Sequence, residues 1–410
     1  MTDLDFSYTI SAPNLSSDTQ TSLWSFNSVK LLPFDANTTA LHNTRTNQGL
    51  LVQAEVAHAL SLCKAFQSLD AHLENIMAAM PPLREEPEDA RNILNYVKNK
   101  GFLESNSSAW QRLTNEVAQH HNSPSRLFIL TCDRTEALAR ILENMVHLDL
   151  DSSIESIWVI DDSRKQASLD QNAGIISSLS DKFSVSVHHV EKLLQRELVD
   201  HLIETLPKHA PSISFLIDSN EWISAATYGR ARNLALLLSV GFRAVILDDD
   251  IILQAIAPPS AGRQLKLGSP SDREAQFYKD HDHLMQHALN MGGDPVTLML
   301  RNVGQTLGGL AKSRLSSPAD LRGWDGDALS RHDSQSSILL NQCGTWGDPG
   351  TDDGNWIFFL PDSSITNLME AGHGIKDLLA ANSCWFGYRG ETLSKYGVMS
   401  QITGLDHRNL

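Results

Sequence analysis

The decapeptide AVILDDDIIL, residues 244–253, places three consecutive carboxylates inside an apolar run. The apolar segment before them is typical of a buried strand. Asp248, Asp249 and Asp250 then follow at its end, where each carboxylate raises the pKa of its neighbours. We expect a divalent cation to remove this conflict. The alternative is a solvated acidic loop that caps the next segment.

Short apolar segments alternate with amphipathic ones on both sides of this decapeptide, from residue 126 to residue 254. Strands are expected at 126–133, 156–163, 185–190 and 214–218, and before the three acids. Helices are expected at 134–146, 173–180, 191–206 and 227–241. This alternation predicts an α/β fold, with a mostly parallel sheet and helices on both faces. After residue 254 it gives way to an irregular region rich in Gly, Asn and Asp.

Acidic residues gather at the carboxyl ends of the expected strands. Asp133 ends one strand, Asp161 and Asp162 end another, and the three acids of the decapeptide end a third. In open α/β sheets this edge binds ligands. Mg²⁺ and Mn²⁺ take oxygen ligands, usually one or two carboxylates together with substrate phosphates. The sequence therefore predicts a Mn²⁺ or Mg²⁺ ion that also holds a diphosphate, with Asp248 and Asp250 on one side of the strand and Asp249 on the other.

Three segments carry a family resemblance: RLFILTCDRTEALARILENMV (126–146), IWVIDDS (157–163) and RNLALLLSVGFRAVILDDDIIL (232–253). In this order they resemble the GT-A fold nucleotide-sugar glycosyltransferases, especially the large family 2 group. The resemblance covers roughly residues 125–255. It implies a Rossmann-like glycosyltransferase domain over 125–410, with a nucleotide-binding half at 125–255 and an acceptor half at 256–410.

The resemblance also implies roles for individual residues. Beside the nucleotide-sugar it places Thr131, Arg134, Asp161, Asp162, Arg232, Asn233, Asp248 and Asp249. Asp162 would hydrogen-bond the base, with Asp161 in support, and uracil is favoured because its imide N–H suits a carboxylate. Asp250 would bind the metal, together with Asp248. Taken singly, Arg230 and Arg232 also fit ordinary helix-surface charges, and Asp162 fits a helix N-cap.

The activity implied is metal-dependent transfer of a sugar from a nucleotide-diphospho-sugar to an unknown acceptor. An inverting reaction needs a carboxylate base after the D-x-D motif. GTWGDPGTDDGNW (344–356) offers the candidates Asp348, Asp352 and Asp353, although a polar turn with buried tryptophans explains the same segment. Otherwise the base lies beyond residue 410 or is absent. In that case the alternative function is an inactive transferase-fold scaffold or peptide-binding protein.

The N-terminal part follows a different pattern. Residues 1–27 are expected to form an irregular arm, and residues 28–120 a winged-helix-like α+β domain. Its expected elements are a strand at 28–34, a hairpin at 38–53 and helices at 54–66, 69–80 and 88–101. This region resembles the winged-helix peptide-recognition domains of ribosomal-peptide modification systems. It thereby implies a peptide partner added as a strand to a sheet edge. A helical lid packed on the catalytic domain is the alternative.

Composition limits the possible partners and compartment. The chain has 410 residues and a net charge of -16, which disfavours nucleic acid and anionic membranes. The segment MTDLDFSYTI has no basic stretch followed by an apolar core, so we expect no signal peptide, and no apolar run approaches about 20 residues. A cytoplasmic protein without a membrane span is predicted. Its four widely spaced cysteines suit a reducing compartment; they are Cys63, Cys132, Cys343 and Cys384.

Two histidine pairs are also present. In DHDHLMQH (280–287), His283 and His287 lie four residues apart near Asp280, which resembles a metal-ligand spacing. A solvated helix face is the expectation we favour there. His188 and His189 are expected to be structural. A nucleotidyltransferase is disfavoured because TCDRTEALAR, after the first strand, contains no glycine for a phosphate loop.

Overall fold

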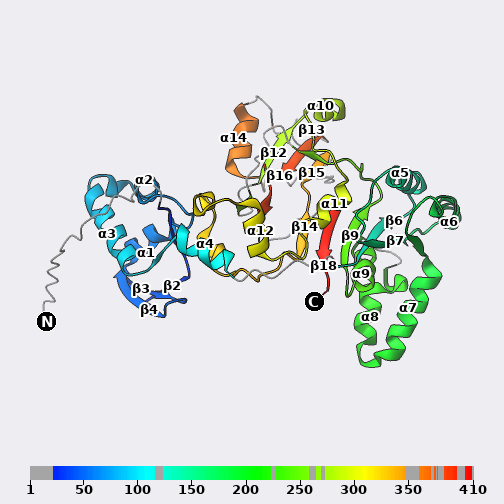
Figure 1. The fold of residues 1–410 in the computed structure, drawn as a ribbon, viewed down its shortest axis with the longest axis horizontal. Helices are drawn as coiled ribbons and strands as arrows, with labels where there is room; N and C mark the ends of the chain where they lie inside the picture. Colours follow the sequence, from blue (N-terminus) through cyan, green and yellow to red (C-terminus); the bar gives the residue numbers. More distant parts are fainter. Residues whose placement is uncertain are drawn as a thin grey trace. The chain divides into compact units, whose positions relative to one another are not determined.

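The computed structural model describes residues 22–115, 123–222, 228–257, 265–268, 273–347, 360–370, 374, 376, 383–394 and 402–408. The chain divides into two compact units (Figure 1). The first comprises Met1–Arg112 and Ser316–Arg331, and the second comprises Leu113–Leu315 and His332–Leu410.

The first unit contains an antiparallel sheet of strand order β2-β3-β4, followed by helices. The strands are β2 (Val29–Pro33), β3 (Thr38–Asn43) and β4 (Gln48–Gln53), and the helices are α1 (Ala54–Ser61), α2 (Leu69–Ala79) and α3 (Pro87–Asn99). Two short strands pair separately, β1 (Trp24–Phe26) with β5 (Leu103–Ser105), and α4 (Asn106–Thr114) follows. The expected succession of strand, hairpin and three helices is confirmed, although α1 ends at Ser61 rather than at residue 66.

The two faces of this small sheet differ in burial. Leu41, in the central strand, is fully buried against α1, α2 and α3. One residue away, the row made of Leu32, Ala40 and Leu51 faces the opposite side, and Leu32 and Leu51 are exposed. β2 and β4 are the two edge strands of the sheet. Within the described residues, the sheet therefore has one covered face, one exposed face with both apolar and polar side chains, and two edges without a paired strand.

Residues 316–331 complete the first unit. The backbone of Phe66 accepts from Gly323 and donates to Trp324, both at 2.9 Å. Trp324 is the largest of the fully buried side chains. Gly326 packs so closely against Ser25 that a Cβ at this position would overlap its hydroxyl. This segment, which contains the 3₁₀ turn η5 (Pro318–Leu321) and α13 (Gly326–Leu329), is therefore an integral part of the core.

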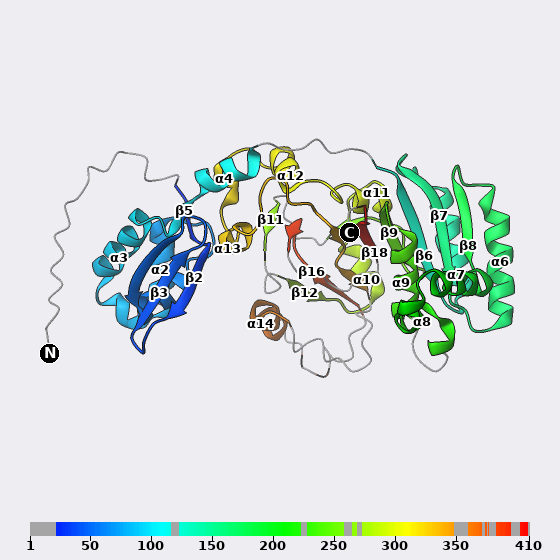
Figure 2. The ribbon, with the colours of Figure 1, turned by 90° about the horizontal axis from the view of Figure 1, so that it is seen from below.

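The second unit is built on a six-stranded sheet of order β14-β18-β9-β6-β7-β8. Its parallel strands are β6 (Ser125–Thr131), β7 (Ile154–Asp161), β8 (Ser186–Val190) and β9 (Arg243–Asp248). Figure 2 shows β9, β6, β7 and β8 side by side in this order. Two further strands extend the sheet beyond β9: β18 (Ile402–Asp406) pairs antiparallel with β9, and β14 (Leu340–Gln342) pairs antiparallel with β18. The expected α/β class with a mostly parallel sheet is confirmed.

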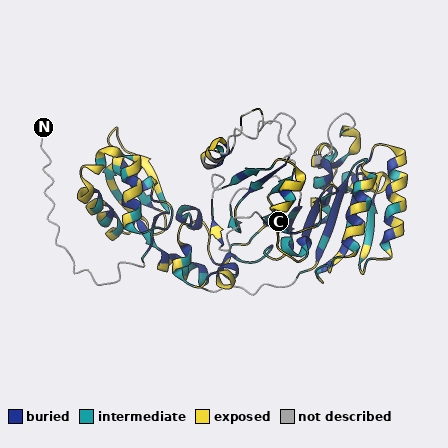
Figure 3. Cartoon of the chain, turned by 90° about the horizontal axis from the view of Figure 1, so that it is seen from above, coloured by how far each residue is buried: buried dark blue, intermediate teal, exposed yellow. Residues whose placement is uncertain are grey.

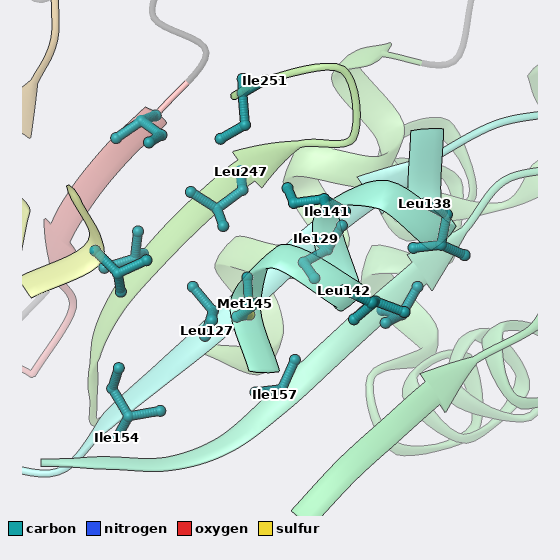
Figure 4. Packing of buried hydrophobic residues seen from close by; sticks show 14 of the residues in the cluster. Leu127, Ile129, Leu138, Ile141, Leu142, Met145, Ile154, Ile157, Leu247 and Ile251 are labelled. Carbon is teal, nitrogen blue, oxygen red and sulfur yellow. The ribbon is translucent and has the colours of Figure 1, made fainter. Parts of the chain in front are cut away.

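Alternate residues of the parallel strands bury opposite faces of the sheet. In β6, Leu127 and Ile129 pack on one side and Phe128 and Leu130 on the other. The first side is covered by α5 (Thr135–Val146), α6 (Gln166–Ser180) and α11 (Pro295–Leu300). Figure 4 shows side chains of α5, such as Leu138 and Met145, among those of the strands. The second is covered by α7 (Lys192–Thr205), α8 (Ala210–Ile217) and α9 (Tyr228–Leu238). Figure 3 shows the strands between these helices mainly in the colour of buried residues.

The strand expected at residues 214–218 is wrong, because this segment belongs to the helix α8. Pro211 stands in the first turn of α8, where a proline's missing N–H costs nothing. Ile213 and Ile217 lie four residues apart and both pack against the sheet. The apolar run SFLI is too short to separate helix from strand by periodicity, and the flanking sequence decides in favour of the helix.

The remaining elements of the second unit are short. A three-stranded antiparallel sheet has the order β12-β16-β15, and two-stranded pairs join β10 to β13 and β11 to β17. The strands are β10 (Ile256–Ala257), β11 (Lys266–Leu267), β12 (Glu274–Phe277), β13 (Leu289–Asn290), β15 (Thr345–Gly347), β16 (Cys384–Gly387) and β17 (Thr392–Leu393). The helices are α10 (His281–Gln286), α12 (Leu307–Arg314) and α14 (Asp362–Glu370). Within the described ranges, none of the helices has both the length and the apolar character to cross a bilayer.

Candidate functional site

The order of the parallel strands creates a switch point at β6. From β6 the chain proceeds outward to β7 and β8, and it then returns to the other side of β6 as β9. Loops that follow neighbouring strands at such a reversal diverge, and ligands bind in the crevice between them. At the carboxyl edge Leu130 is opposite Asp248, and Thr131 is opposite Asp161. The acids expected at strand ends therefore lie on both sides of the switch point.

Three acids and two arginines meet at this point. Arg232, on α9, donates to both carboxylate oxygens of Asp248, at 2.8 and 2.9 Å. Arg134, which precedes α5, lies 2.6 Å from Asp250 and 3.4 Å from Asp249. The two guanidinium groups thus contact all three carboxylates. These two guanidinium groups offset much of the repulsion among the three carboxylates, for which the sequence alone suggested only a metal ion.

The expected alternation of the three acids is wrong beyond Asp248. Because β9 ends at Asp248, Asp249 and Asp250 belong to the following turn. Both contact Arg134, whereas Asp248 contacts Arg232. Extended backbone is required for side chains to alternate, and a turn removes that constraint. The site is therefore a pair of neighbouring carboxylates next to a third that is held separately.

Burial distinguishes the acids from one another. The side chain of Asp249 is 5% exposed, that of Asp250 is 43% exposed, and that of Arg134 is 51% exposed. Burial raises the pKa of Asp249, and the hydroxyl of Thr131, which donates to it at 2.7 Å, acts against this rise. Burial likewise raises the pKa of Asp248, against the effect of Arg232. The hydrogen bond to Asp250 raises the pKa of Arg134, so its guanidinium stays charged.

The turns after β6 and β7 are joined through Asp133. This residue has a φ of 54°, an unusual conformation for a non-glycine residue. Its carboxylate accepts the backbone N–H groups of Arg164 and Lys165, at 3.1 and 3.0 Å. Its own N–H donates to the Ser163 hydroxyl at 2.8 Å. The strained turn that carries Arg134 is therefore held in place by the neighbouring turn.

Asp161 faces away from the switch point into a polar network. Its carboxylate is fully buried and accepts from the Ser163 N–H and the Asn172 amide, both at 2.9 Å. His189 lies 3.2 Å from it. Burial acts to raise the pKa of Asp161, but these hydrogen bonds prevail and lower it. Asp161 therefore orders the turn that carries Asp162.

Asp162 forms a buried ion pair with Arg230 on α9. The Arg230 side chain is 1% exposed and also donates to the Ile217 carbonyl at 2.9 Å and to Gln195 at 2.7 Å. Burial lowers the pKa of Arg230 to about 10, which leaves it charged at neutral pH. Helix-surface charge is therefore the wrong interpretation for Arg230. Residues two apart on a helix face different directions. The spacing of Arg230 and Arg232 therefore indicated that the two side chains could not both lie on the same exposed face.

One oxygen of Asp162 has no hydrogen-bond partner in the described structure. Oδ1 contacts Arg230, whereas Oδ2 is buried and unsatisfied. Leaving a buried acceptor without a donor costs about 1–3 kcal/mol, so such atoms are uncommon in native proteins. A ligand N–H reaching Oδ2 would remove this cost.

Other predicted residues lie elsewhere or outside the described residues. The amide of Asn233 donates to the Leu216 carbonyl of α8, at 3.0 Å, so it joins α9 to α8. Arg232, its neighbour, reaches the acids. Asp348, Asp352 and Asp353 all lie outside the described residues.

The histidine pair of residues 280–287 belongs to a helix and its cap. Asp280 caps α10 through the His283 N–H at 2.8 Å. The His283 Nδ1 accepts from the backbone of Lys279, and the His287 Nδ1 donates to the His283 carbonyl. Both histidines are exposed, in line with a helix face. Across the described ranges, no three His, Cys, Asp or Glu side chains are grouped so as to hold a metal.

The oxygen donors at the switch point fit a divalent cation in their chemistry. Asp249 and Asp250 present carboxylates to one shared cationic partner, and the Thr131 hydroxyl lies beside them. Mg²⁺ in particular is usually bound by one or two carboxylates and completed by substrate phosphates and water. A two-carboxylate arrangement is therefore sufficient on the protein side.

No protein-family model matches the chain, and no curated protein matches it in a sequence search.

We predict that Arg230→Met lowers the free energy of unfolding of the second unit by about 3–5 kcal/mol, because it leaves the buried Asp162 carboxylate uncompensated. Urea unfolding at pH 7 measures this loss. Arg196→Met, at a position whose side chain is 76% exposed, is the control and should change little. The double variant Arg230→Met/Asp162→Leu should recover part of the loss. A loss below about 1 kcal/mol would show that the pair is not desolvated.

We predict that Asp249→Asn stabilises the ligand-free protein at neutral pH. Burial raises the pKa of Asp249 above 3.8, so the folded state binds its proton to higher pH than the unfolded state does. The ionised Asp249 therefore destabilises the folded protein at pH values above its pKa in the folded state. This destabilisation disappears as the pH falls to 3.8 and below, where Asp249 is protonated in both the folded and the unfolded state. Urea unfolding over this range should show an advantage for the Asp249→Asn variant that shrinks on acidification. An exposed control, Asp181→Asn, should show no such trend; an advantage that grows toward low pH contradicts the assignment.

Proposed function

We propose that the protein is a metal-dependent glycosyltransferase with a GT-A, family 2-like fold. It transfers a sugar from a nucleotide-diphospho-sugar, with a UDP-sugar favoured, to an acceptor. The observation that carries this proposal is the meeting of Arg134, Arg232 and three carboxylates at the switch point between β6 and β9. This combination offers cations for a diphosphate and oxygen ligands for a metal on one sheet edge.

Each part of the site has a task in this proposal. Asp162 Oδ2 accepts an N–H from the nucleobase; uracil and guanine offer a ring N–H, whereas the corresponding ring nitrogen of cytosine is an acceptor and only its amino group donates. Arg134 and Arg232 bind the diphosphate oxygens, for which a guanidinium is well shaped. Asp249 and Asp250, with Asp248 beside them, would hold Mn²⁺ or Mg²⁺. The ion supplies charge stabilisation to the departing diphosphate.

The residues proposed to activate the acceptor are inferred from the sequence alone. An acceptor hydroxyl loses its proton to a carboxylate in an inverting transfer. Asp348, Asp352 and Asp353 remain the candidates for this base, in a segment with Trp346 and Trp356.

We predict that a nucleotide-diphospho-sugar raises the thermal stability of the wild-type chain only when Mn²⁺ or Mg²⁺ is present. A ligand at about 100 times its dissociation constant adds about 2.7 kcal/mol, which differential scanning fluorimetry detects. Asp250→Ala should abolish the shift, because it removes one of the two adjacent carboxylates. The exposed control Asp181→Ala should retain it. Full retention of donor binding in Asp250→Ala would overturn the proposed site.

We propose further that the acceptor is a peptide and that the first unit binds it. Support comes from the sequence resemblance and from the open edges of β2 and β4 in the antiparallel sheet. An added strand pairs its backbone with such an edge, and side-chain pockets supply the specificity. The exposed leucines on β2 and β4, Leu32 and Leu51, offer apolar contacts beside those edges.

The peptide proposal predicts that peptides selected from a display library against the full chain protect backbone amides of β2 or β4 from hydrogen exchange. A bound strand hydrogen-bonds these amides directly. Leu51→Asp should weaken the selected peptides by about tenfold, a loss of about 1.4 kcal/mol. The exposed residue Leu289, in the second unit, offers the matched control Leu289→Asp. Protection confined to the second unit would contradict a role for the first.

A scaffold without turnover is the second candidate function. It is favoured by the arginine contacts of all three acids, which give the cluster internal charge balance without a ligand. Turnover of any nucleotide-sugar by the purified chain rules this candidate out. Donor binding without release of nucleotide diphosphate, over a panel of peptide acceptors, favours it.

A further inference from the structure

One nitrogen atom of Arg134 contacts both carboxylates of the acidic turn. Its Nη1 lies 2.6 Å from Asp250 Oδ2 and 3.4 Å from Asp249 Oδ1. The acids follow β9, whereas Arg134 precedes α5, so the contact crosses the switch point. The guanidinium therefore already neutralises the oxygen atoms that a divalent cation would need.

A guanidinium and a divalent cation are competitors for these oxygens. Mg²⁺ requires near-octahedral coordination at about 2.0–2.1 Å, which takes the carboxylate lone pairs that an N–H donor uses. The two positive groups also repel each other at short range. Cation binding at Asp249 and Asp250 therefore requires the Arg134 side chain to move away.

Arg134 is the partner best able to move. Its side chain is 51% exposed, whereas that of Asp249 is 5% exposed and is held by the Thr131 hydroxyl at 2.7 Å. The backbone under Arg134 is in turn fixed by the hydrogen bonds of Asp133. The guanidinium can thus swing on its flexible stem while the turn and the Asp249 carboxylate stay in place.

We propose that Arg134 occupies the place of the cation between Asp249 and Asp250 until a nucleotide diphosphate binds, and that its guanidinium then transfers to the diphosphate. This inference rests on the proposed function, because the donor's diphosphate is the second anion. A planar guanidinium binds phosphate oxygens in a bidentate way, so the transfer exchanges one charged partner for another. Cation and diphosphate then bind with positive coupling, and the cation binds weakly without the nucleotide.

The test measures Mn²⁺ binding by electron paramagnetic resonance, with and without UDP, in the full chain. Without UDP, Arg134→Gln should bind Mn²⁺ about tenfold more tightly than wild type, because the competitor is gone. With UDP the wild-type affinity for Mn²⁺ should rise by at least about tenfold. In Arg134→Gln this gain should be smaller than in wild type, because only the direct coordination of Mn²⁺ by the diphosphate remains and no arginine is transferred.

The matched control is Arg140→Gln, which removes the same charge from an exposed position within α5, six residues further along the chain. It should bind Mn²⁺ as wild type does, which separates local competition from a general change of charge. Asp250→Asn in the Arg134→Gln background should remove the gained affinity and thereby assign it to this turn. Equal Mn²⁺ affinity of Arg134→Gln and Arg140→Gln overturns the inference, and so does an unchanged effect of UDP in Arg134→Gln.

The measurements without UDP and with UDP together distinguish failure of this inference from failure of the proposed function. If nucleotide-sugars bind with Mn²⁺ but Arg134→Gln behaves like Arg140→Gln, the proposed function stands and the transfer of Arg134 is wrong. If no UDP effect exists in wild type, the transfer is wrong and the proposed donor site fails with it. If Arg134→Gln binds Mn²⁺ more tightly but UDP has no effect in wild type, Arg134 competes with the cation but does not move to a diphosphate. This result contradicts the proposed transfer.

Discussion

The pairing of β6 on both of its edges is the constraint on which the candidate site depends. β7 and β9 flank β6 in parallel, and the chain reaches them in opposite directions. Residues separated by more than a hundred positions are thereby brought within hydrogen-bonding distance, as Thr131 and Asp249 show. The side chains at the carboxyl ends of the three strands then have to share one small volume. The apolar layers on both sides of β6 make this arrangement rigid.

Three arginines pair with aspartates at that edge, and two of them, Arg230 and Arg134, are of different kinds. Arg230 is buried and ties β7, α7, α8 and α9 together, so it belongs to the framework. Arg134 is half exposed and contacts two carboxylates from a strained turn. A framework cation cannot leave without unfolding its surroundings, whereas an exposed one can exchange partners. This difference is why the two residues are assigned different roles although both pair with aspartates.

The sequence predicted those parts of the structure that depend on local pattern. Parallel strands with β-branched apolar runs, such as β6 and β7, were recognisable because both faces are buried. The helix α8 was not, because SFLI is four residues long and equally apolar in either conformation. β18 was also missed, since ITGLD is short and polar in part and gains its strand conformation by pairing with β9. Long-range pairing leaves no periodic signal in a single sequence.

In the candidate site, too, the sequence predicted some features, whereas others depend on long-range contacts. The order of motifs suggested that Thr131, Arg134 and the three acids lie near one another, and their contacts agree. Which arginine pairs with which acid depends on side-chain direction at element ends, and periodicity does not define it. Asp133 illustrates this point, because its left-handed backbone is required by hydrogen bonds to a turn thirty residues away.

The insertion of residues 316–331 into the first unit has a consequence for biosynthesis. Trp324 fills that unit's core but leaves the ribosome long after α3. At about 5–20 residues per second, the N-terminal segment waits about 10–40 s before its core can close. During this interval the six-stranded sheet of the second unit is also incomplete, since β14 and β18 come later still, although its four parallel strands are already made. The first unit is therefore complete only once Arg331 has emerged, and its core stays open to chaperones while most of the second unit is being synthesised.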